Sequence, residues 1–430
     1  MKYILLLLIL IYIFVQGTKN FSKTVLGIYS LVLIIPISGT EYIDTSSMLK
    51  IGSINVLEIA VVFLFVLGVI RRKILVLKKD LINILAMCLM CIYVIGVLVN
   101  FEKARCIADA KDYILPLLLF FCMRAVLRSE NSFEVYIQTT LKGLRINAFI
   151  ILVGYFVYWL PSGLNGRYGF GCESLYVFSI PIQVYFCLNN SLKKDKIRNI
   201  WGASIQTFLV LINQTRSLIL CLILIFVCYL AIGLFKRNSG HGFVRKIVLL
   251  VVVIFVGGMG YNYLLINASS LSGWMYRMSE LFDYGMETKS NTIRLALINY
   301  YLPKIFSNPF GYGFGVSMPV WDFTTPDTLS LVSGEALAID NLLITYIYKL
   351  GVIPGIVYIA VYVKSFYKLL KIKTEISGLT IIRISCLVLI IPTMIMSVQG
   401  LKYLSIASFY WGIIATIPTI KGNSIGINTD

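Results

Sequence analysis

Long apolar runs recur along the whole chain and are separated by polar connectors. Each run holds about 15–20 residues, a length that as a helix crosses a bilayer core of about 30 Å. Because lipid offers the backbone no hydrogen-bond partners, only helices and closed barrels cross a membrane. The runs lack the alternation of apolar and polar residues that barrel strands show. With 58% apolar and 13% charged residues, the chain is predicted to be all-α, a polytopic transmembrane helical bundle.

The apolar runs predict about twelve to thirteen spans. Short connectors rich in Lys and Arg, such as 71–79, 193–198 and 236–246, mark the cytoplasmic side of a membrane protein. The net charge of +18 is placed in such connectors, which argues against nucleic-acid binding. The predicted spans are 3–16, 24–39, 53–70, 81–99, 113–127, 143–160, 174–190, 199–213, 217–235, 247–265, 341–365, 380–399 and 403–420.

Two polar segments are expected on the outer face, a short loop at 161–173 and a large extracytoplasmic loop at 267–338. They divide the chain into N-terminal helices (1–266, including the short loop), the large loop, and C-terminal helices (339–430). Residues 291–306 show helical periodicity, so the large loop is expected to contain short helices. Long loops in compact proteins are usually functional, and the site is therefore expected here.

Glycine recurs after Pro309, at Gly311, Gly313 and Gly315. Pro309 and these glycines are expected to stop any helix and to allow a tight turn or a close approach of the backbone to a ligand. Further on, Gly351 and Gly355 flank Pro354, and the helix that begins near residue 340 is expected to break or kink there.

A few arginines remain on the outer face, where positive charge is normally depleted. Arg216 lies in a very short turn between two apolar runs, where a guanidinium usually faces a cavity and pairs with an anion. Arg167 lies in the short outer loop, and Arg277 and Arg294 lie in the large one. Arginine suits phosphate because its planar group donates two parallel hydrogen bonds. The structural alternative for all four is snorkelling to the interface or pairing with a carboxylate.

Asp340 and Asn341 open an apolar helix at the water boundary. Asp is a good N-cap residue, so a purely structural role is sufficient to explain it. A carboxylate at this place would also face the mouth of a cavity, where it could act as a base. Both interpretations remain open.

Cysteine and histidine offer little chemistry. Most of the nine cysteines lie within predicted spans, and Cys106 and Cys172, expected outside, leave a disulfide between them open. The single histidine, His241, lies in a basic cytoplasmic connector, so no histidine-based metal site or triad is expected. No phosphate loop for ATP occurs, and no cofactor is expected.

Over about residues 143–370 the chain resembles the O-antigen polymerase (Wzy-type) and O-antigen ligase superfamily. The resemblance rests on the order of short motifs and on the topology. The motifs are Gly166-Arg167-Tyr-Gly, Thr215-Arg216-Ser, Arg294, the segment from Asn308 to Gly315, Asp340-Asn341-Leu-Leu, and Lys349-Leu-Gly-Val-Ile-Pro-Gly355.

The resemblance implies a metal-independent membrane glycosyltransferase that uses undecaprenyl-diphosphate-linked oligosaccharide at the outer face of the bacterial inner membrane. It implies diphosphate binding by arginines of the outer loops, which correspond to Arg167, Arg216 and Arg294. Ligases of this superfamily carry a histidine where this chain has Asp340, and this departure favours a polymerase.

Asp340 is the first candidate for the base that deprotonates the acceptor hydroxyl, and Glu335 is the second. Arg277 is a further candidate diphosphate ligand, while Gly311, Gly313, Gly315 and Asn341 are expected to shape the loop. A chain-length regulator is a further candidate partner, besides the lipid-linked substrate and membrane lipid. The product would be O-antigen, capsule or secreted polysaccharide. The alternatives are a flippase or transporter of lipid-linked oligosaccharide and, second, an O-antigen ligase.

Overall fold

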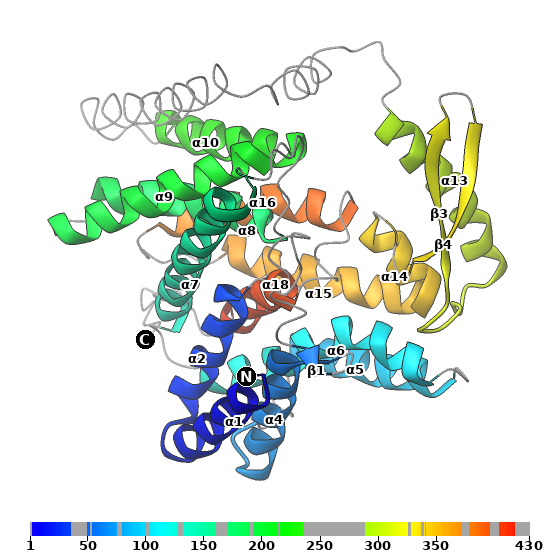
Figure 1. Ribbon diagram of the computed structural model, residues 1–430, viewed down its shortest axis with the longest axis horizontal. Helices are drawn as coiled ribbons and strands as arrows, with labels where there is room; N and C mark the ends of the chain where they lie inside the picture. The colour runs from blue at the N-terminus through cyan, green and yellow to red at the C-terminus, as the bar shows by residue number, and fades with distance from the viewer. Residues whose placement is uncertain are drawn as a thin grey trace, which may run out of the picture.

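In the computed structural model the chain is built almost entirely of helices, in agreement with the predicted all-α class (Figure 1). The structure describes residues 2–35, 50–51, 54–74, 80–99, 103–127, 132–159, 161, 171–189, 192–213, 215–235, 289–325, 328–336, 339, 341–371, 378–395 and 404–417. All structural statements below refer to these residues.

Among its described residues, the N-terminal part contains five helices and a short antiparallel pair of strands. They are α1 (Lys2–Lys19), α2 (Phe21–Ile34), β1 (Lys50–Ile51), β2 (Ile54–Asn55), α4 (Val56–Ile70), α5 (Leu81–Val99) and α6 (Lys103–Val126). Local capping fixes several starts: the Asn20 side chain accepts from the Lys23 amide at the start of α2. At the start of α4, Asn55 and Glu58 form a capping box, in which the side chain of each residue accepts a hydrogen bond from the backbone amide of the other.

Four further helices follow, the first of them extended by one π-helical turn. They are α7 (Ser132–Gly154) with η1 (Tyr155–Trp159), α8 (Glu173–Asn189), α9 (Lys193–Asn213) and α10 (Arg216–Phe235). Helices α8 and α9 pack closely, and polar side chains meet in their interface: Gln183 Nε2 donates to Gln206 Oε1 over 2.8 Å. Such interhelical hydrogen bonds are a common means of joining helices in an apolar environment.

The C-terminal part begins in the large loop. Its elements are α13 (Lys289–Ser307), β3 (Met318–Thr325), β4 (Thr328–Ala336), α14 (Leu342–Leu350), α15 (Val352–Lys371), α16 (Leu379–Ile395) and α18 (Leu404–Thr416). The predicted span 341–365 is divided at Gly351, which has φ 95° and ends α14. The expected break is therefore confirmed.

The large loop is only partly as predicted. The helix expected over 291–306 is confirmed by α13, whose Leu297, Tyr301 and Ile305 are buried. The helix ends at Ser307, before Pro309, as expected. The loop also contains an element that was not predicted, because β3 and β4 form an antiparallel hairpin beside α13 (Figure 1).

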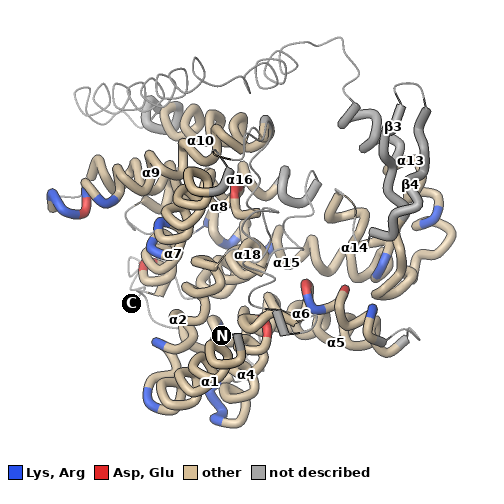
Figure 2. Tube along the Cα trace, viewed as in Figure 1, with Lys and Arg blue, Asp and Glu red and all other residues tan. Residues whose placement is uncertain are grey.

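Apolar side chains of these helices form one large buried cluster and a smaller one under α13 and α14. Among the described residues, three helices are long and apolar enough to cross a membrane, at Leu81–Leu98, Ser132–Val157 and Val352–Lys371, and six shorter apolar helices accompany them. The predicted spans coincide broadly with helices, except 247–265, which lies outside the described residues. Figure 2 shows Lys and Arg mostly near helix ends, for instance at the start of α9.

Candidate functional site

The glycines after α13 form a tight connection that is pressed against other backbone. Gly311, Gly313 and Gly315 have φ of 82°, 84° and 81°, a conformation that glycine adopts without steric cost. A Cβ atom on Gly311 would lie 2.5 Å from the Gly351 amide nitrogen, and one on Gly315 would lie 3.0 Å from the Cys106 amide nitrogen. The expected tight turn is present, and the glycines allow the segment to lie against the protein's own backbone. A close approach to a ligand stays a prediction.

This glycine segment, residues 308–317, fills the break between α14 and α15. The amides of Tyr312 and Gly313 donate to the carbonyls of Tyr348 and Lys349 over 3.0 and 2.7 Å. The amide of Val352 donates to the Pro309 carbonyl over 2.9 Å. A broken helix leaves carbonyl and amide groups without intrahelical partners, and the glycine segment satisfies them. Its position is thus fixed by the helix break.

A buried ion pair joins the glycine segment to α6. Lys349, at the end of α14, donates to both carboxylate oxygens of Asp109. The two side chains are 0% and 5% exposed. The Gly315 amide donates to Asp109 Oδ2 over 2.8 Å. One carboxylate therefore holds α6, α14 and the glycine segment together.

Two neighbours of Asp109 on α6 add contacts to the same segment. The Cys106 thiol donates to the Phe314 carbonyl over 3.1 Å, and Arg105 donates to the Ser317 hydroxyl. The Phe314 ring is fully buried against the rings of Tyr93 and Tyr113. Charged, thiol and aromatic contacts together clamp the glycine segment of the large loop onto α6 and α14.

A second ion pair joins α6 to α4. Lys111 Nζ lies 2.9 Å from Glu58 Oε1 on α4, and the other Glu58 oxygen accepts from the Asn55 amide over 2.9 Å. Asp109 and Lys111 thus tie α6 to two different neighbours. The charged first turns of α6 form a junction between the glycine segment and α4.

No role was predicted from the sequence for Asp109, Lys111, Glu58 or Lys349. Lys349 carried a usable signal, because an ionisable residue inside an apolar run needs a partner. Nothing in the sequence identified that partner, which lies 240 positions away.

The structure describes the predicted basic residues only in part. Arg294 lies in α13 and Arg216 is the first residue of α10, but their side chains lie outside the described atoms. Arg167 and Arg277 lie outside the described residues altogether. Whether the four guanidinium groups converge therefore stays a prediction.

The predicted carboxylates stand similarly. Glu335 lies in β4, where it pairs with Pro319 of β3, and Asp340 lies outside the described residues. Asn341 is the N-cap of α14, with its side chain accepting from the Ile344 amide over 3.0 Å. The capping role considered for Asp340 is therefore filled by Asn341.

The disulfide left open between Cys106 and Cys172 does not form. Both are buried free thiols. Cys172 donates to Asn147 Oδ1 over 3.1 Å, while Cys106 donates to the glycine segment.

No model of a known protein family matches this chain. A comparison with curated proteins likewise yields no match.

Proposed function

We propose that the chain is a polysaccharide repeat-unit polymerase, a membrane glycosyltransferase of the bacterial inner membrane. It would transfer an oligosaccharide from undecaprenyl diphosphate onto the next lipid-linked unit at the outer face. The observation that carries the proposal is the clamp on the large loop. The large loop contains an arginine-bearing helix, α13, and the glycine segment that follows α13 is fixed by Asp109 and Lys349 to helices α6 and α14. A fixed polar loop at that level suits a substrate with a lipid tail and a sugar head.

The proposed reaction needs an acceptor hydroxyl, a base and a stabilised leaving group. The hydroxyl oxygen of the acceptor sugar forms a bond to the anomeric carbon, and the bond from that carbon to the diphosphate oxygen breaks. The hydroxyl proton passes to the carboxylate of Asp340, with Glu335 as the second candidate. Negative charge collects on the departing lipid diphosphate, where Arg167, Arg216, Arg277 and Arg294 would bind it. Fixed donors aimed at such charge commonly account for about 10²–10³ in rate each.

Replacement of Arg294 tests the proposal. In a deletion strain complemented with Arg294→Ala, we expect single repeat units in place of long chains, while Arg294→Lys should retain some polymer. Lys304→Ala, near the other end of α13, is the matched control and should give long chains. Gel electrophoresis of the glycan, with immunoblots for membrane insertion, measures the result.

Other outcomes would assign a different function. Long chains of normal length in Arg294→Ala would exclude the role given to this arginine. Accumulation of lipid-linked units on the cytoplasmic leaflet of the deletion strain would favour a flippase. Unattached long polymer on undecaprenyl diphosphate would favour a ligase.

A further inference from the structure

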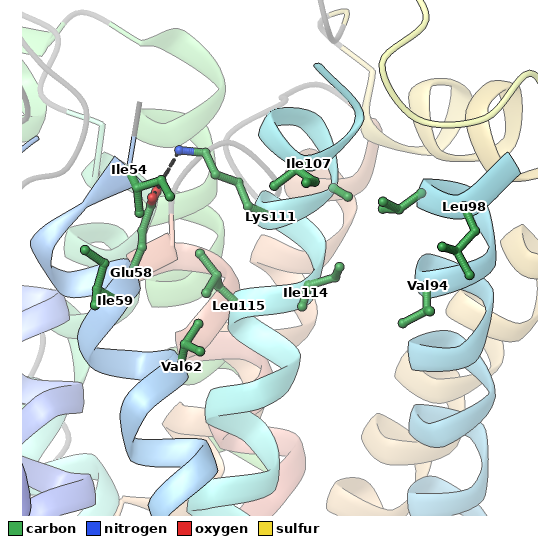
Figure 3. A pocket seen from close by; sticks show the side chains of 12 residues that line it. Ile54, Glu58, Ile59, Val62, Val94, Leu98, Ile107, Lys111, Ile114 and Leu115 are labelled. Atoms are coloured by element: carbon green, nitrogen blue, oxygen red, sulfur yellow. Dashed lines mark hydrogen bonds and ion pairs between the residues drawn. The ribbon is translucent and has the colours of Figure 1, made fainter. Parts of the chain in front are cut away.

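An apolar groove lies along the outward face of α6, between α4 and α5 (Figure 3). Its volume is about 450 Å³, within the range of about 300–1,000 Å³ that is usual for ligand sites. Ten of its twelve lining residues are apolar, and the other two are Glu58 and Lys111. The groove thus has an apolar body and one charged pair.

The groove opens away from the protein core. Val94 and Leu98 of α5 line it and are 45% and 66% exposed, and Ile107 of α6 is 54% exposed. α5 is one of the helices long and apolar enough to cross a membrane. In a bilayer, exposed apolar side chains at this place meet hydrocarbon, so the occupant of the groove is a hydrocarbon chain.

The charged pair links the groove to the clamp. Lys111 Nζ lies 2.9 Å from Glu58 Oε1, and the two residues belong to the N-terminal parts of α6 and α4. On the same turns of α6, Asp109 and Cys106 hold the glycine segment. A chain lying in the groove would therefore bring its polar head beside the loop that carries Arg294.

The lining of the groove is a wall of branched side chains. Seven of the ten apolar residues are Ile or Val, whose side chains occupy few rotamers. A wall of rigid side chains is preorganised and loses little conformational entropy of its own when a hydrocarbon chain binds to it. In lipid, association depends on van der Waals fit, because the surrounding lipid tails are as apolar as the groove and there is no hydrophobic driving force.

We infer that the groove between α4, α5 and α6 binds the polyisoprenyl chain of the lipid-diphosphate donor. The inference rests on the proposed polymerase function and adds the place where the donor's tail enters. The groove fixes the tail, the Glu58–Lys111 pair marks the boundary with the polar head, and the clamped loop receives the diphosphate.

Photo-crosslinking tests the groove directly. The full-length protein is reconstituted in nanodiscs of phosphatidylethanolamine and phosphatidylglycerol with a diazirine-bearing undecaprenyl diphosphate, and labelled peptides are mapped by mass spectrometry. We expect labels on the groove faces of α5 and α6. Excess undecaprenyl diphosphate should abolish them, whereas excess phosphatidylglycerol should not.

Two pairs of variants provide the controls. Val94→Trp and Val62→Trp place an indole in the groove and should lower labelling at least about threefold, because the chain loses its packing surface. Ile95→Trp and Val66→Trp lie on the same helices, outside the groove, at comparable exposure. They should label as the wild type does.

Labelling that phosphatidylglycerol suppresses equally would show an ordinary lipid site and overturn the inference. Equal labelling in all four variants would overturn it as well. The failure of the polymerase proposal looks different: groove labelling would persist while Arg294→Ala made long chains. Conversely, if the wild type made long chains but its groove were not labelled, the inference about the groove would be wrong and the polymerase proposal would be unaffected.

Discussion

At the scale of single residues, the Asp109–Lys349 pair is the most constrained feature of the described molecule. A buried ammonium requires a partner, because burial of an unpaired charge costs several kcal/mol. Lys349 meets this requirement with Asp109, and Asp109 has a second partner in the Gly315 amide. The pair therefore sets the position of the glycine segment on α6.

Asp109→Asn should destabilise the protein by about 3–5 kcal/mol, because it leaves the Lys349 ammonium buried without a counter-charge. The double variant Asp109→Leu/Lys349→Met should recover most of the loss, since it removes both charges. Thermal unfolding in detergent, followed by size-exclusion chromatography, measures the difference.

Asp195→Asn is the matched control, because the Asp195–Arg198 pair is 28% and 53% exposed. Surface pairs of this kind contribute about 0–1 kcal/mol, so this variant should unfold close to the wild-type temperature. If Asp109→Asn unfolded there too, the buried pair would not hold the clamp.

At the scale of elements, the break between α14 and α15 and the glycine segment form one unit. Each lacks backbone hydrogen bonds alone, and each supplies them to the other. α13 then packs on α14 through Leu297, Tyr301 and Ile305, so the position of α13 depends on the glycine segment. A change in the segment is expected to move the arginine-bearing helix.

Gly311→Ala should displace the glycine segment from the break between α14 and α15. Both the φ of 82° and a Cβ only 2.5 Å from the Gly351 nitrogen are unfavourable for alanine. Strained backbone of this kind costs about 1–3 kcal/mol per residue. In a background where Cys106 is the single cysteine, we expect a water-soluble maleimide to react with Gly311→Ala and not with the wild type, whose Cys106 is fully buried.

Ser307→Ala changes an exposed residue just before the segment and should leave Cys106 protected. Equal protection of Cys106 in Gly311→Ala would mean that the segment tolerates a side chain at this place. Polymer length measured on the same variants then tells whether the position of α13 matters for activity.

At the scale of the whole molecule, the proposals require a particular orientation. The basic start of α9 and the end of α13 should face opposite sides of the membrane. Ser307→Cys should react with an impermeant maleimide on intact cells, whereas Lys194→Cys should react only after permeabilisation. A cysteine-free background is used for both, and both residues lie at helix ends.

The reverse labelling pattern would place α13 in the cytoplasm and would exclude transfer at the outer face. Labelling of both positions from outside would show that the helices between them do not alternate across the bilayer as predicted.

The sequence by itself determined where most of the described helices lie and several of their ends, although α6 and α7 begin about ten residues before the predicted spans. An α-helix satisfies its backbone hydrogen bonds within one segment, so an apolar run and a terminal glycine or proline suffice. The helix expected over 291–306, which is α13, its end before Pro309 and the break at Gly351 were all predictable for this reason.

Tertiary structure alone decided the features that join distant segments. The pairing of Lys349 with Asp109, the β3–β4 hairpin in the large loop and the groove between α4, α5 and α6 depend on how helices cross and which residues meet there. A local pattern records that a charge or a strand needs a partner, but the partner's identity is fixed only when the chain has packed.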